Sequence, residues 1–418
     1  MAIHIGTGNG CTVYKKCGGC QLQNMTYQQQ LSYKQVKVIG LLGKFGHVSQ
    51  IIGMEKPVHY RCKVQAAYGK AHGNIISGVY QSTSRRIVPV ESCMLEDETA
   101  DAIIVTIRKL LKSFKLKPYD KDTRSGFLRH VLIRKGYYTG QIMVVLVTGT
   151  EEFPSQRSFV NALVGRYPEI TTVVQNVNDK MTDLVLGKKS NVLYGDGYIE
   201  DTIFESAFRI SPKSFYQINP QMTTVLYGKA LEFMGLTGKE TVLDTYCGTG
   251  TIGLLASKKA GKVIGVELNP EAVRDAKWNA KRNNAENVEF YTGDASAFME
   301  DMANEGMKAD VVIMDPPRAG SDQRFMRAAV KLGPERIVYV SCNPETQARD
   351  LTFFTKHGYR VRKMQPVDMF PHTGHVETVC LLSKLNTKQH IEINLDMDEL
   401  DLTDAEKKAT YQEIKDYV

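Results

Sequence analysis

Apolar residues in the first half of the chain follow helical and strand periods in turn. Spacings of three and four residues predict helices over 27–42 and 97–115, and in the second helix Ile103, Ile107 and Leu111 fall on one side. A further helix is expected over 154–166. Short apolar runs within 60–90 and at 130–136, 141–149 and 170–178 predict strands bounded by turn residues. This half is therefore expected to be mixed α+β with hairpin-like connections.

Beyond about residue 220, strands and helices alternate. Strands are expected at 240–247, 262–268, 288–294, 309–315, 336–342 and 378–384. Helices are expected at 222–234, directly after 250, and at 270–284, 295–304, 321–331 and 344–357. Because alternating units cover a sheet with helices on both faces, this half predicts a parallel, doubly wound α/β sheet.

Composition and charge narrow the class of protein. The 418 residues suggest two or three domains, and 42 % hydrophobic with 24 % charged residues excludes a disordered chain. No apolar run could span a membrane and no signal peptide is evident, so we expect a cytoplasmic protein with no membrane partner. The net charge is +7, divided into −5 for residues 385–418 and +12 for the rest. A basic body favours a polyanionic partner, although solubility alone is the simpler explanation.

A glycine-rich loop follows the strand at 240–247. The sequence DTYCGTGTIG begins at Asp244 and contains the GxGxxG spacing of dinucleotide sites. However, a carboxylate before the first glycine repels a pyrophosphate and favours a cofactor with an ammonium group, such as S-adenosylmethionine. Glu267 ends the next strand, where an acid can accept hydrogen bonds from both ribose hydroxyls, and Asp294 ends the third, close to the expected place of the adenine.

Reactive residues follow the next strands. Asp315 opens DPPRAG after the fourth strand, and Cys342 ends the fifth, directly before a helix whose N-terminus favours a thiolate. A lone cysteine in this position would more often be an inert core residue. The loop 367–377 holds Asp368, His372, His375 and Glu377 and could supply a general base. Zinc on its two histidines is the weaker interpretation, because the spacing is not a zinc pattern.

Cysteines also cluster near the N-terminus. Cys11, Cys17 and Cys20 are separated by five and two residues, and Cys93 or Cys62 could complete a set of four. Four thiolates suit a zinc ion or an iron–sulfur cluster equally by count. A disulfide framework is not expected in a cytoplasmic chain.

Several motifs in a fixed order resemble one family. DPPRAG, then IVYVSCNPET sixteen residues later, then VDMFPHTGHVE resemble the paired signatures of the RNA 5-methyluridine (uracil-C5) methyltransferase family. SFYQIN at 214–219 and DTYCGTGTIG are similar to its cofactor motifs, and TRSGFLRHVLIR at 123–134 resembles its RNA-facing segment. The resemblance extends from Cys11 to about Lys384.

The resemblance implies a fold and a mechanism. The fold is a Rossmann-like S-adenosylmethionine-dependent methyltransferase domain with an α+β central domain that carries an iron–sulfur cluster. The central domain is expected at 1–29 and 62–205, the catalytic domain at 30–61 and 206–384, and an acidic extension at 385–418. Cys342 would add to C6 of a uracil, C5 would take the methyl group, and Glu377 would remove the C5 proton.

The family's functional positions carry over to matching residues. The implied S-adenosylmethionine-binding residues are Gln217, Tyr246, Glu267 and Asp315, with Asp294 as a further member. The target base must leave its stack, so a basic surface is expected around it. The candidates for phosphate contacts are Arg124, Arg129, His130, Arg134 and Lys213.

The cysteines select a branch of the family. Its ribosomal RNA branch carries a [4Fe–4S] cluster on this spacing, which implies Cys11, Cys17, Cys20 and Cys93 as ligands and 23S ribosomal RNA as the substrate. Transfer RNA is the alternative, because the chemistry is shared. With the first cysteine at residue 11, the small β-barrel RNA-binding domain of many ribosomal members is expected to be absent, and which uridine is modified stays open. We expect a monomer.

Competing functions are weaker. A radical enzyme would need a Cys-x3-Cys-x2-Cys loop, which is absent. DNA cytosine-5 methyltransferases place the nucleophile after a proline, whereas Cys342 follows Ser341. An oxidoreductase would bind a nicotinamide cofactor. An RNA-binding module without activity would be expected to have lost Cys342, Glu377 or Asp315.

Overall fold

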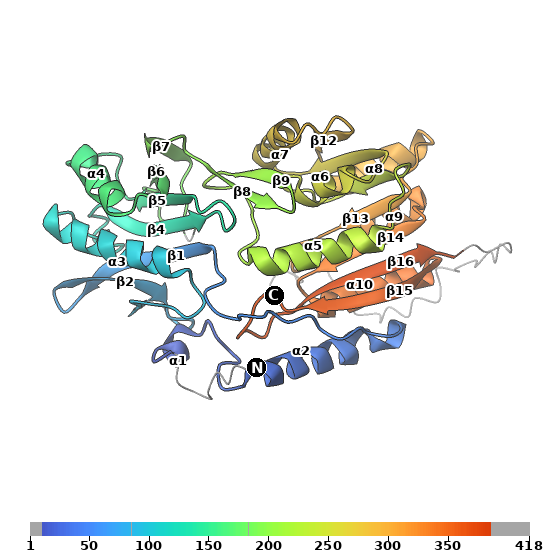
Figure 1. The fold of residues 1–418 in the computed structure, drawn as a ribbon, viewed down its shortest axis with the longest axis horizontal. Coiled ribbons are helices and arrows are strands. Elements are labelled where there is room, and N and C mark those ends of the chain that lie inside the picture. The colour runs from blue at the N-terminus through green and yellow to red at the C-terminus, as the bar shows by residue number, and fades with distance from the viewer. Residues whose placement is uncertain (1–10, 85, 183, 386–418) are drawn as a thin grey trace, which may run out of the picture. The chain divides into compact units, whose positions relative to one another are not determined.

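The protein contains two large sheets. The computed structural model describes residues 11–84, 86–182 and 184–385. The first sheet has seven strands in the order β3-β2-β1-β4-β5-β6-β7 (Figure 1). Its neighbours are antiparallel except β5 and β6, which run parallel and are joined through α4. The elements are β1 (Lys63–Ala71), β2 (Asn74–Tyr80), β3 (Ile87–Pro89), β4 (Leu128–Lys135), β5 (Ile142–Thr148), α4 (Gln156–Arg166), β6 (Ile170–Val177) and β7 (Lys189–Tyr194).

One helix of the first half shows how the sequence pattern becomes packing. α3 (Glu98–Ser113) begins at Asp97, whose carboxylate accepts hydrogen bonds from the backbone of Thr99 and Ala100. Its apolar side, including Ile103 and Ile107, is buried in one cluster with β4, β5 and α4. The predicted helices at 97–115 and 154–166 and the mixed α+β character are therefore confirmed.

The second sheet carries the alternating half of the chain. Its order is β12-β11-β10-β13-β14-β16-β15. The first five are parallel, as predicted, and β16 is antiparallel to both β14 and β15. The strands are β10 (Thr241–Asp244), β11 (Lys262–Glu267), β12 (Val288–Thr292), β13 (Val311–Met314), β14 (Arg336–Ser341), β15 (Tyr359–Val367) and β16 (Glu377–Lys384).

β15 is an element that the sequence pattern did not predict. Its first half alternates buried and exposed residues with charged side chains, as suits a strand at a sheet edge. A loop without a helix connects β15 to β16, so β16 returns in the opposite direction. Glu377 is therefore the first residue of a strand that lies beside β14, with Thr378 opposite Ser341.

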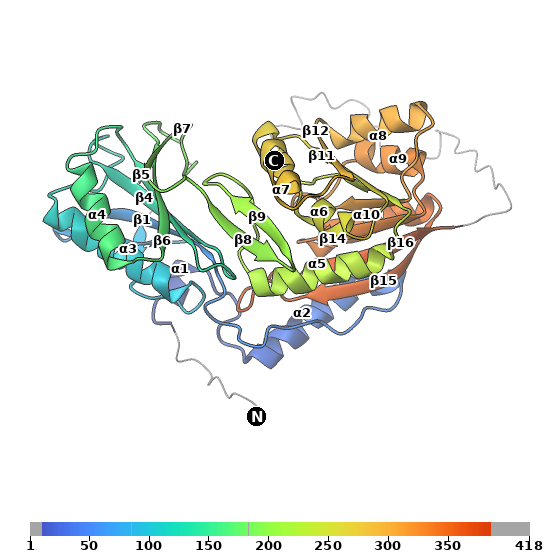
Figure 2. The same cartoon turned by 45° about the horizontal axis from the view of Figure 1, so that its top comes forward.

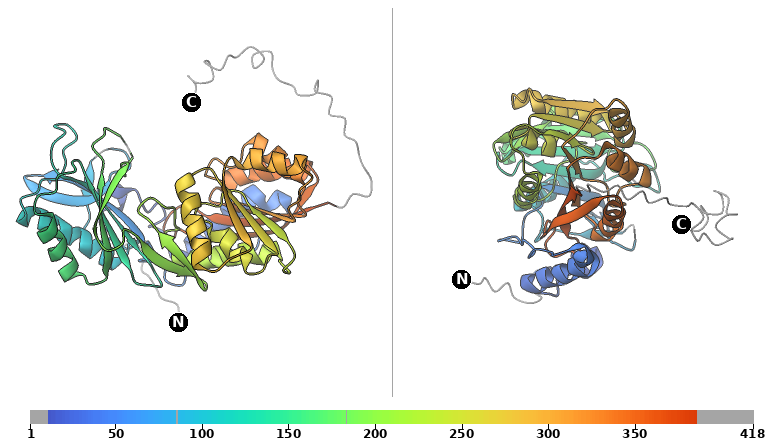
Figure 3. Two further views of the ribbon diagram at one scale, coloured as in Figure 1. Left: turned by 90° about the horizontal axis from the view of Figure 1, so that it is seen from above. Right: turned by 90° about the vertical axis from the view of Figure 1, so that its right-hand side faces the viewer.

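Helices cover both faces of the second sheet (Figures 2 and 3). One apolar cluster joins it to α5 (Pro220–Met234), α6 (Thr251–Ser257) and α7 (Pro270–Arg282). The other joins it to α8 (Ala295–Asn304), α9 (Gln323–Leu332) and α10 (Pro344–Lys356). Val38 and Leu42 of α2 (Tyr27–Leu42) belong to this second cluster, so α2 packs against catalytic-half elements despite its place in the chain.

Short elements connect the two halves. The hairpin of β8 (Ile199–Ile203) and β9 (Ser206–Ile210), also not predicted, packs on α7, where Asn279 and Asn283 accept its backbone N–H groups. The remaining elements are α1 (Tyr14–Cys17) and the 3-10 turn η1 (Gly43–Phe45). The exact domain bounds stay a prediction, and the predicted acidic extension lies, beyond Leu385, outside the described residues. Within the described ranges no helix is long and apolar enough to cross a membrane.

Candidate active site

The carboxyl ends of β10, β11, β13 and β14 meet at one edge of the parallel sheet, which is where open α/β folds bind ligands. The edge carries the acids expected from the sequence. Asp244 ends β10, Glu267 ends β11, and Asp315 directly follows β13. Cys342 directly follows β14.

Two of these acids shape the glycine-rich loop. The Asp244 carboxylate accepts a hydrogen bond from the Gly253 backbone at 2.9 Å, and a Cβ at Gly253 would stand only 3.0 Å from that carboxylate. Glu267 accepts from the Gly248 backbone at 3.1 Å and from Asn269 at 2.8 Å. The loop is thus folded around the two carboxylates, which retain further lone pairs for a cationic or hydroxyl-bearing ligand.

Three other residues are expected from the sequence to bind the cofactor. The Tyr246 ring packs on Phe325 with centroids 5.1 Å apart, and burial raises the pKa of its phenol to about 12. Asp294 caps α8 through the Ala297 backbone at 2.9 Å and stays exposed near Arg324. Gln217 is half-buried in the segment before α5, and its side chain hydrogen-bonds to the phenol of Tyr227.

Tyr227 is a site residue that sequence reasoning missed. It lies on α5, is 4 % exposed, and its phenol is close enough to Asp315, Glu377 and Asp244 to feel their charges. Burial is the main cause that raises its pKa far above the ordinary value. In the sequence, Tyr227 is only a tyrosine on the apolar side of a predicted helix. An ordinary core residue would give the same pattern.

The group formed by Asp244, Asp315, Arg318, Cys342 and Glu377, called the reactive centre here, comes from four separate segments of the chain. Burial raises the pKa of Asp315 to about 7 and that of Glu377 to about 8, with Asp315 adding to the effect on Glu377. The Asp244 carboxyl is also raised, to about 7, mainly by burial and further by Asp315 and Glu267. Several carboxyl groups therefore share a confined space and disfavour each other's ionisation.

Cys342 differs from the sequence-based expectation of a thiolate. Burial raises the pKa of its thiol to about 11, and the charges of Glu377 and Asp315 raise it further. Arg318 acts in the opposite direction and is too weak to reverse the shift. In the ligand-free protein burial, together with the neighbouring carboxylates, thus outweighs the N-terminus of α10, and Cys342 is a thiol at neutral pH.

Arg318 is the cation of this centre. Its charge lowers the pKa of both Cys342 and Glu377. Its guanidinium lies 2.7 Å from Nδ1 of His375, whose pKa is lowered by burial and by Arg318 itself. His375 is therefore neutral, and its Nδ1 accepts a hydrogen bond from Arg318.

The four cysteines of the N-terminal pattern lie near one another. Burial raises the pKa of Cys20 to about 12, and Cys93, Cys17 and Cys11 are all close enough to contribute. In the described part of the chain, no group of three His, Cys, Asp or Glu residues is arranged to hold a single metal ion. Cys62, the alternative fourth cysteine, is buried and donates to the carbonyl of Gln217 at 3.5 Å instead.

Three of the five expected phosphate contacts are corrected by the structure. Arg129 is buried over the Tyr119 ring and donates to the carbonyls of Asn178 and Lys180. Arg134 is buried and donates to the carbonyls of Ser211 and Ser214. The remaining residue, His130, is 5 % exposed, and burial lowers its pKa to about 4.

These three side chains lie on β4, a central strand in which nearly every residue is buried. Of the five candidates, Arg124 and Lys213 are the ones that the structure leaves exposed. They stay predictions as phosphate contacts.

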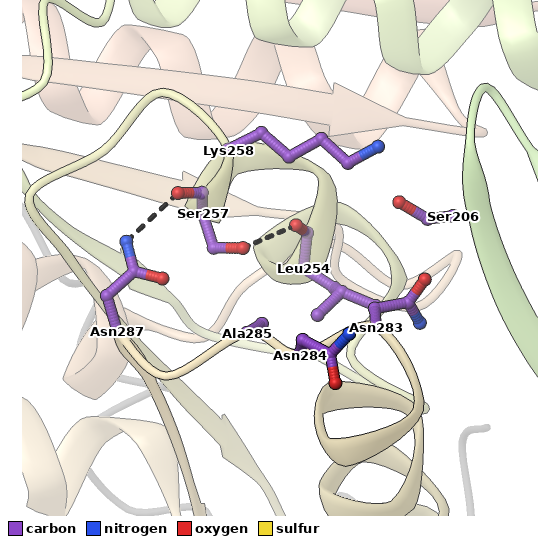
Figure 4. Close-up of a pocket in the computed structure, with 8 residues that line it drawn as sticks. All are labelled: Ser206, Leu254, Ser257, Lys258, Asn283, Asn284, Ala285 and Asn287. Carbon is purple, nitrogen blue, oxygen red and sulfur yellow. Dashed lines mark hydrogen bonds between the residues drawn. The ribbon is translucent and has the colours of Figure 1, made fainter.

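A small cavity lies away from this edge. It has a volume of about 150 Å³ and is lined mainly by polar residues, including Ser206, Lys258 and Asn284 (Figure 4). Its lining belongs to the end of α6 and to the segment before β12, at the amino ends of β11 and β12. It is therefore not part of the reactive centre.

The strand order, the glycine-rich loop and the acids at successive strand ends define an S-adenosylmethionine-dependent methyltransferase. Comparison with known proteins gives the family. Residues 175–385 match the sequence model of tRNA (uracil-5-)-methyltransferase. The chain is 45 % identical over 381 residues to an RNA methyltransferase of Halalkalibacterium halodurans, with 90 % of this chain and 83 % of the relative covered. An RNA methyltransferase of Clostridium tetani is also 45 % identical, over 383 residues, with 91 % and 83 % covered.

A solved structure agrees with these relatives. The tRNA (uracil-54, C5)-methyltransferase of Pyrococcus abyssi, in complex with S-adenosyl-L-homocysteine, superposes with a TM-score of 0.73 at 29 % identity. The match covers 87 % of this chain and 85 % of that one. The chain belongs to the tRNA (uracil-5-)-methyltransferase family, and it is an RNA (uracil-5-)-methyltransferase that uses S-adenosylmethionine.

Proposed function

We propose that this enzyme methylates C5 of a uridine in 23S ribosomal RNA through a covalent adduct between Cys342 and C6. The observation that carries the mechanism is the convergence of Cys342 and Glu377, from β14 and β16, on Asp315 and Arg318. A nucleophile, a carboxylate base and a cation in one confined space are what covalent activation of a uracil requires.

The proposed reaction has three steps: addition, methyl transfer and elimination. The Cys342 thiolate forms a bond to C6, and the C5=C6 electron pair moves toward O4 as an enolate. C5 then attacks the sulfonium methyl group, which leaves S-adenosylhomocysteine. The Glu377 carboxylate removes the C5 proton, the electron pair re-forms C5=C6, and the thiolate departs. Gln217, Tyr246, Glu267, Asp315 and Asp294 are the proposed cofactor-binding residues.

The choice of ribosomal RNA rests on the cysteines. We propose that Cys11, Cys17, Cys20 and Cys93 hold a [4Fe–4S] cluster, as the resemblance to the ribosomal branch implies. The residues fit such a group in three respects. Three of the thiols lie close to Cys20, the Cys93 sulfur accepts hydrogen bonds from the Leu95 and Glu96 backbone, and Arg61, which also lies near Cys20, has a buried Nε without a partner.

In such a cluster each of the four cysteines would bind a different iron atom. The cluster would serve as a structural clamp, because four cysteines leave no iron open to substrate. Transfer RNA is the second candidate substrate, because the family description and the Pyrococcus abyssi enzyme both name it.

The deciding experiment incubates anaerobically purified protein and S-adenosylmethionine with unmodified 23S ribosomal RNA or transfer RNA, followed by nucleoside mass spectrometry. We expect 5-methyluridine in ribosomal RNA and none with Cys342→Ala. Methylation of transfer RNA alone would reject the substrate assignment and keep the chemistry. With Glu377→Gln we expect a denaturant-stable RNA–protein adduct that carries the methyl group, and its absence would reject the base assignment.

The cluster has its own test. Anaerobic protein should be coloured, with four iron atoms per chain. Cys93→Ser should bleach the colour and lower the thermal midpoint, whereas Cys380→Ser, in the core of the second sheet, should keep the colour. A colourless, zinc-containing preparation would overturn the assignment.

A further inference from the structure

The loop 368–376 between β15 and β16 is clamped by residues from the far end of the sequence. Lys34 of α2 donates to the Asp368 carboxylate at 2.6 Å and to the Phe370 carbonyl at 3.0 Å. Both side chains of this ion pair are fully buried. A buried ion pair of this kind adds little net stability to the fold. It still fixes the position of the loop relative to α2, because separating the two groups would leave a buried charge without a partner.

A second clamp holds a strained residue of the same loop. His372 has a backbone φ of 67°, which is unfavourable for a residue other than glycine. Gln30, one turn before Lys34 on α2, accepts from the His372 backbone at 2.8 Å and contacts its ring Nδ1 at 3.2 Å. The His372 carbonyl accepts from the Leu22 backbone at 3.0 Å. The strain therefore persists because three contacts impose it.

The loop ends at the reactive centre. His375, three residues beyond His372, is the residue whose Nδ1 holds the Arg318 guanidinium. Arg318 is exposed and has no carboxylate at salt-bridge distance among the described residues, so His375 decides where its charge lies. Displacement of the loop would move His375 and release that charge from Cys342 and Glu377.

We propose that Gln30 and Lys34 are positioning residues, which through the loop 368–376 hold His375 and so fix Arg318 beside Cys342 and Glu377. The proposal rests on the proposed roles of Cys342 and Glu377. The buried residues of α2 are spaced four apart along one side of the helix. Gln30 and Lys34 are the polar ones and receive the positioning role, whereas Val38 and Leu42 are core residues.

The groups that face Cys342 are Glu377 from β16, Asp315 and Arg318 from the segment after β13, and His375 beyond them. In this set Arg318 is the cation. When it moves away, fewer Cys342 side chains are thiolates at a given pH. The alkylation rate of Cys342 in ligand-free protein reports this directly, without any RNA or cofactor.

The experiment compares Gln30→Ala with Gln28→Ala, an exposed glutamine on the same helix. Peptide mass spectrometry follows iodoacetamide labelling of Cys342 as a function of pH. For Gln30→Ala we expect the labelling curve to move to higher pH and the rate near pH 8 to fall about tenfold, the effect of one pKa unit. Turnover at saturating RNA should fall at least as far, with S-adenosylmethionine affinity within about twofold of the parent. Gln28→Ala should behave as the parent.

A second variant keeps the proposal testable if Gln30→Ala does not fold. Lys34→Met combined with Asp368→Leu removes the other clamp without leaving a lone buried charge. We expect the same shift in labelling. Parent-like labelling and turnover in a folded variant would overturn the proposal. If the parent itself fails to methylate either RNA while the labelling shift occurs, the proposed function fails and the positioning role stands.

Discussion

Two buried carboxyl groups, Asp244 and Glu377, and the half-buried Asp315 meet at the reactive centre with one nearby guanidinium. Asp244, Asp315 and Glu377 all have raised pKa values because burial penalises their charged forms. A cofactor that carries an ammonium and a sulfonium group would offset this crowding, whereas an anionic pyrophosphate would not. The acids therefore favour a cationic cofactor on energetic grounds, independently of any motif.

The charge of Arg318 can be tested at this scale. Arg318→Met removes the charge that lowers the pKa of Cys342 and Glu377, so both values rise. Because both groups act as anions in the proposed mechanism, single-turnover methylation should need a higher pH, with a shift of about one unit. Arg318→Lys should retain part of the effect. A profile that stays in place or moves to lower pH would contradict this role.

The same carboxyl groups make stability depend on pH. Their folded-state pKa values lie above the unfolded values, so their contribution is complete below about pH 4 and is lost as pH rises through about 7 to 8. Cofactor-free protein should therefore lose stability from about pH 4 to pH 8, with little further loss above pH 8. Asp315→Asn should reduce that loss by roughly 4 kcal/mol. Urea unfolding at several pH values measures both, and an unchanged slope in the variant would refute the assignment.

At the scale of single elements, helix α10 holds one loop of the site in place. α10 starts directly after Cys342, and its Asp350 is a fully buried anchor. That carboxylate accepts from the Ser321 backbone at 2.9 Å, from the Tyr339 hydroxyl at 2.8 Å and from Arg349 at 2.8 Å. One side chain thus ties α10 to the end of the DPPRAG loop and to β14.

Removal of this anchor should be costly. Asp350→Ala leaves two buried donors without an acceptor, which should lower the free energy of unfolding by about 3 kcal/mol. Asp350→Asn keeps one acceptor oxygen and should cost less. Denaturant unfolding gives both values, and equal stability of the alanine variant and the parent would show that the loop is held elsewhere.

The sequence predicted those parts of the site that depend on strand order. Asp244, Glu267, Asp315 and Cys342 end successive parallel strands, so the fold class alone brings them to one edge. Tyr227 and the pairing of Arg318 with His375 depend on contacts between distant segments, which no local pattern records.

The misassigned basic residues have a related cause. Charge type does not reveal burial, and β4 is a central strand whose side chains on both faces are covered. The wrong expectation of a thiolate at Cys342 has the same cause. The helix that follows Cys342 can be predicted from the sequence, whereas its burial and the carboxylates beside it cannot. β15 was missed because an edge strand with charged residues has a weak apolar signal.

At the scale of the whole molecule, Arg134 connects the half of the chain that forms the first sheet to the segment before the second sheet. It lies on β4, and its guanidinium donates at 2.6 and 2.7 Å to the carbonyls of Ser211 and Ser214. Gln217 follows three residues later. A central-sheet residue therefore holds the segment that presents a proposed cofactor ligand.

This connection predicts an effect on cofactor affinity without direct contact. Arg134→Met should weaken S-adenosylmethionine binding about tenfold, because the carbonyls lose their donors and the segment relaxes. Arg124→Met, at an exposed position, should leave it unchanged. Calorimetric titration with the cofactor distinguishes the two, and equal affinity for both variants would remove Arg134 from this role.

The clamps on the loop 368–376 also bear on how the chain is synthesised. Lys34 and Gln30 emerge early, whereas Asp368 and His372 lie 334 and 342 residues later. Contacts of such sequence separation form late in folding. Before these contacts form, Lys34 lacks its partner Asp368 and is not yet buried. A nascent or prematurely terminated chain therefore has an incomplete reactive centre. A chain that ends before residue 368 therefore contains Gln30 and Lys34, but neither the loop that they hold nor Glu377.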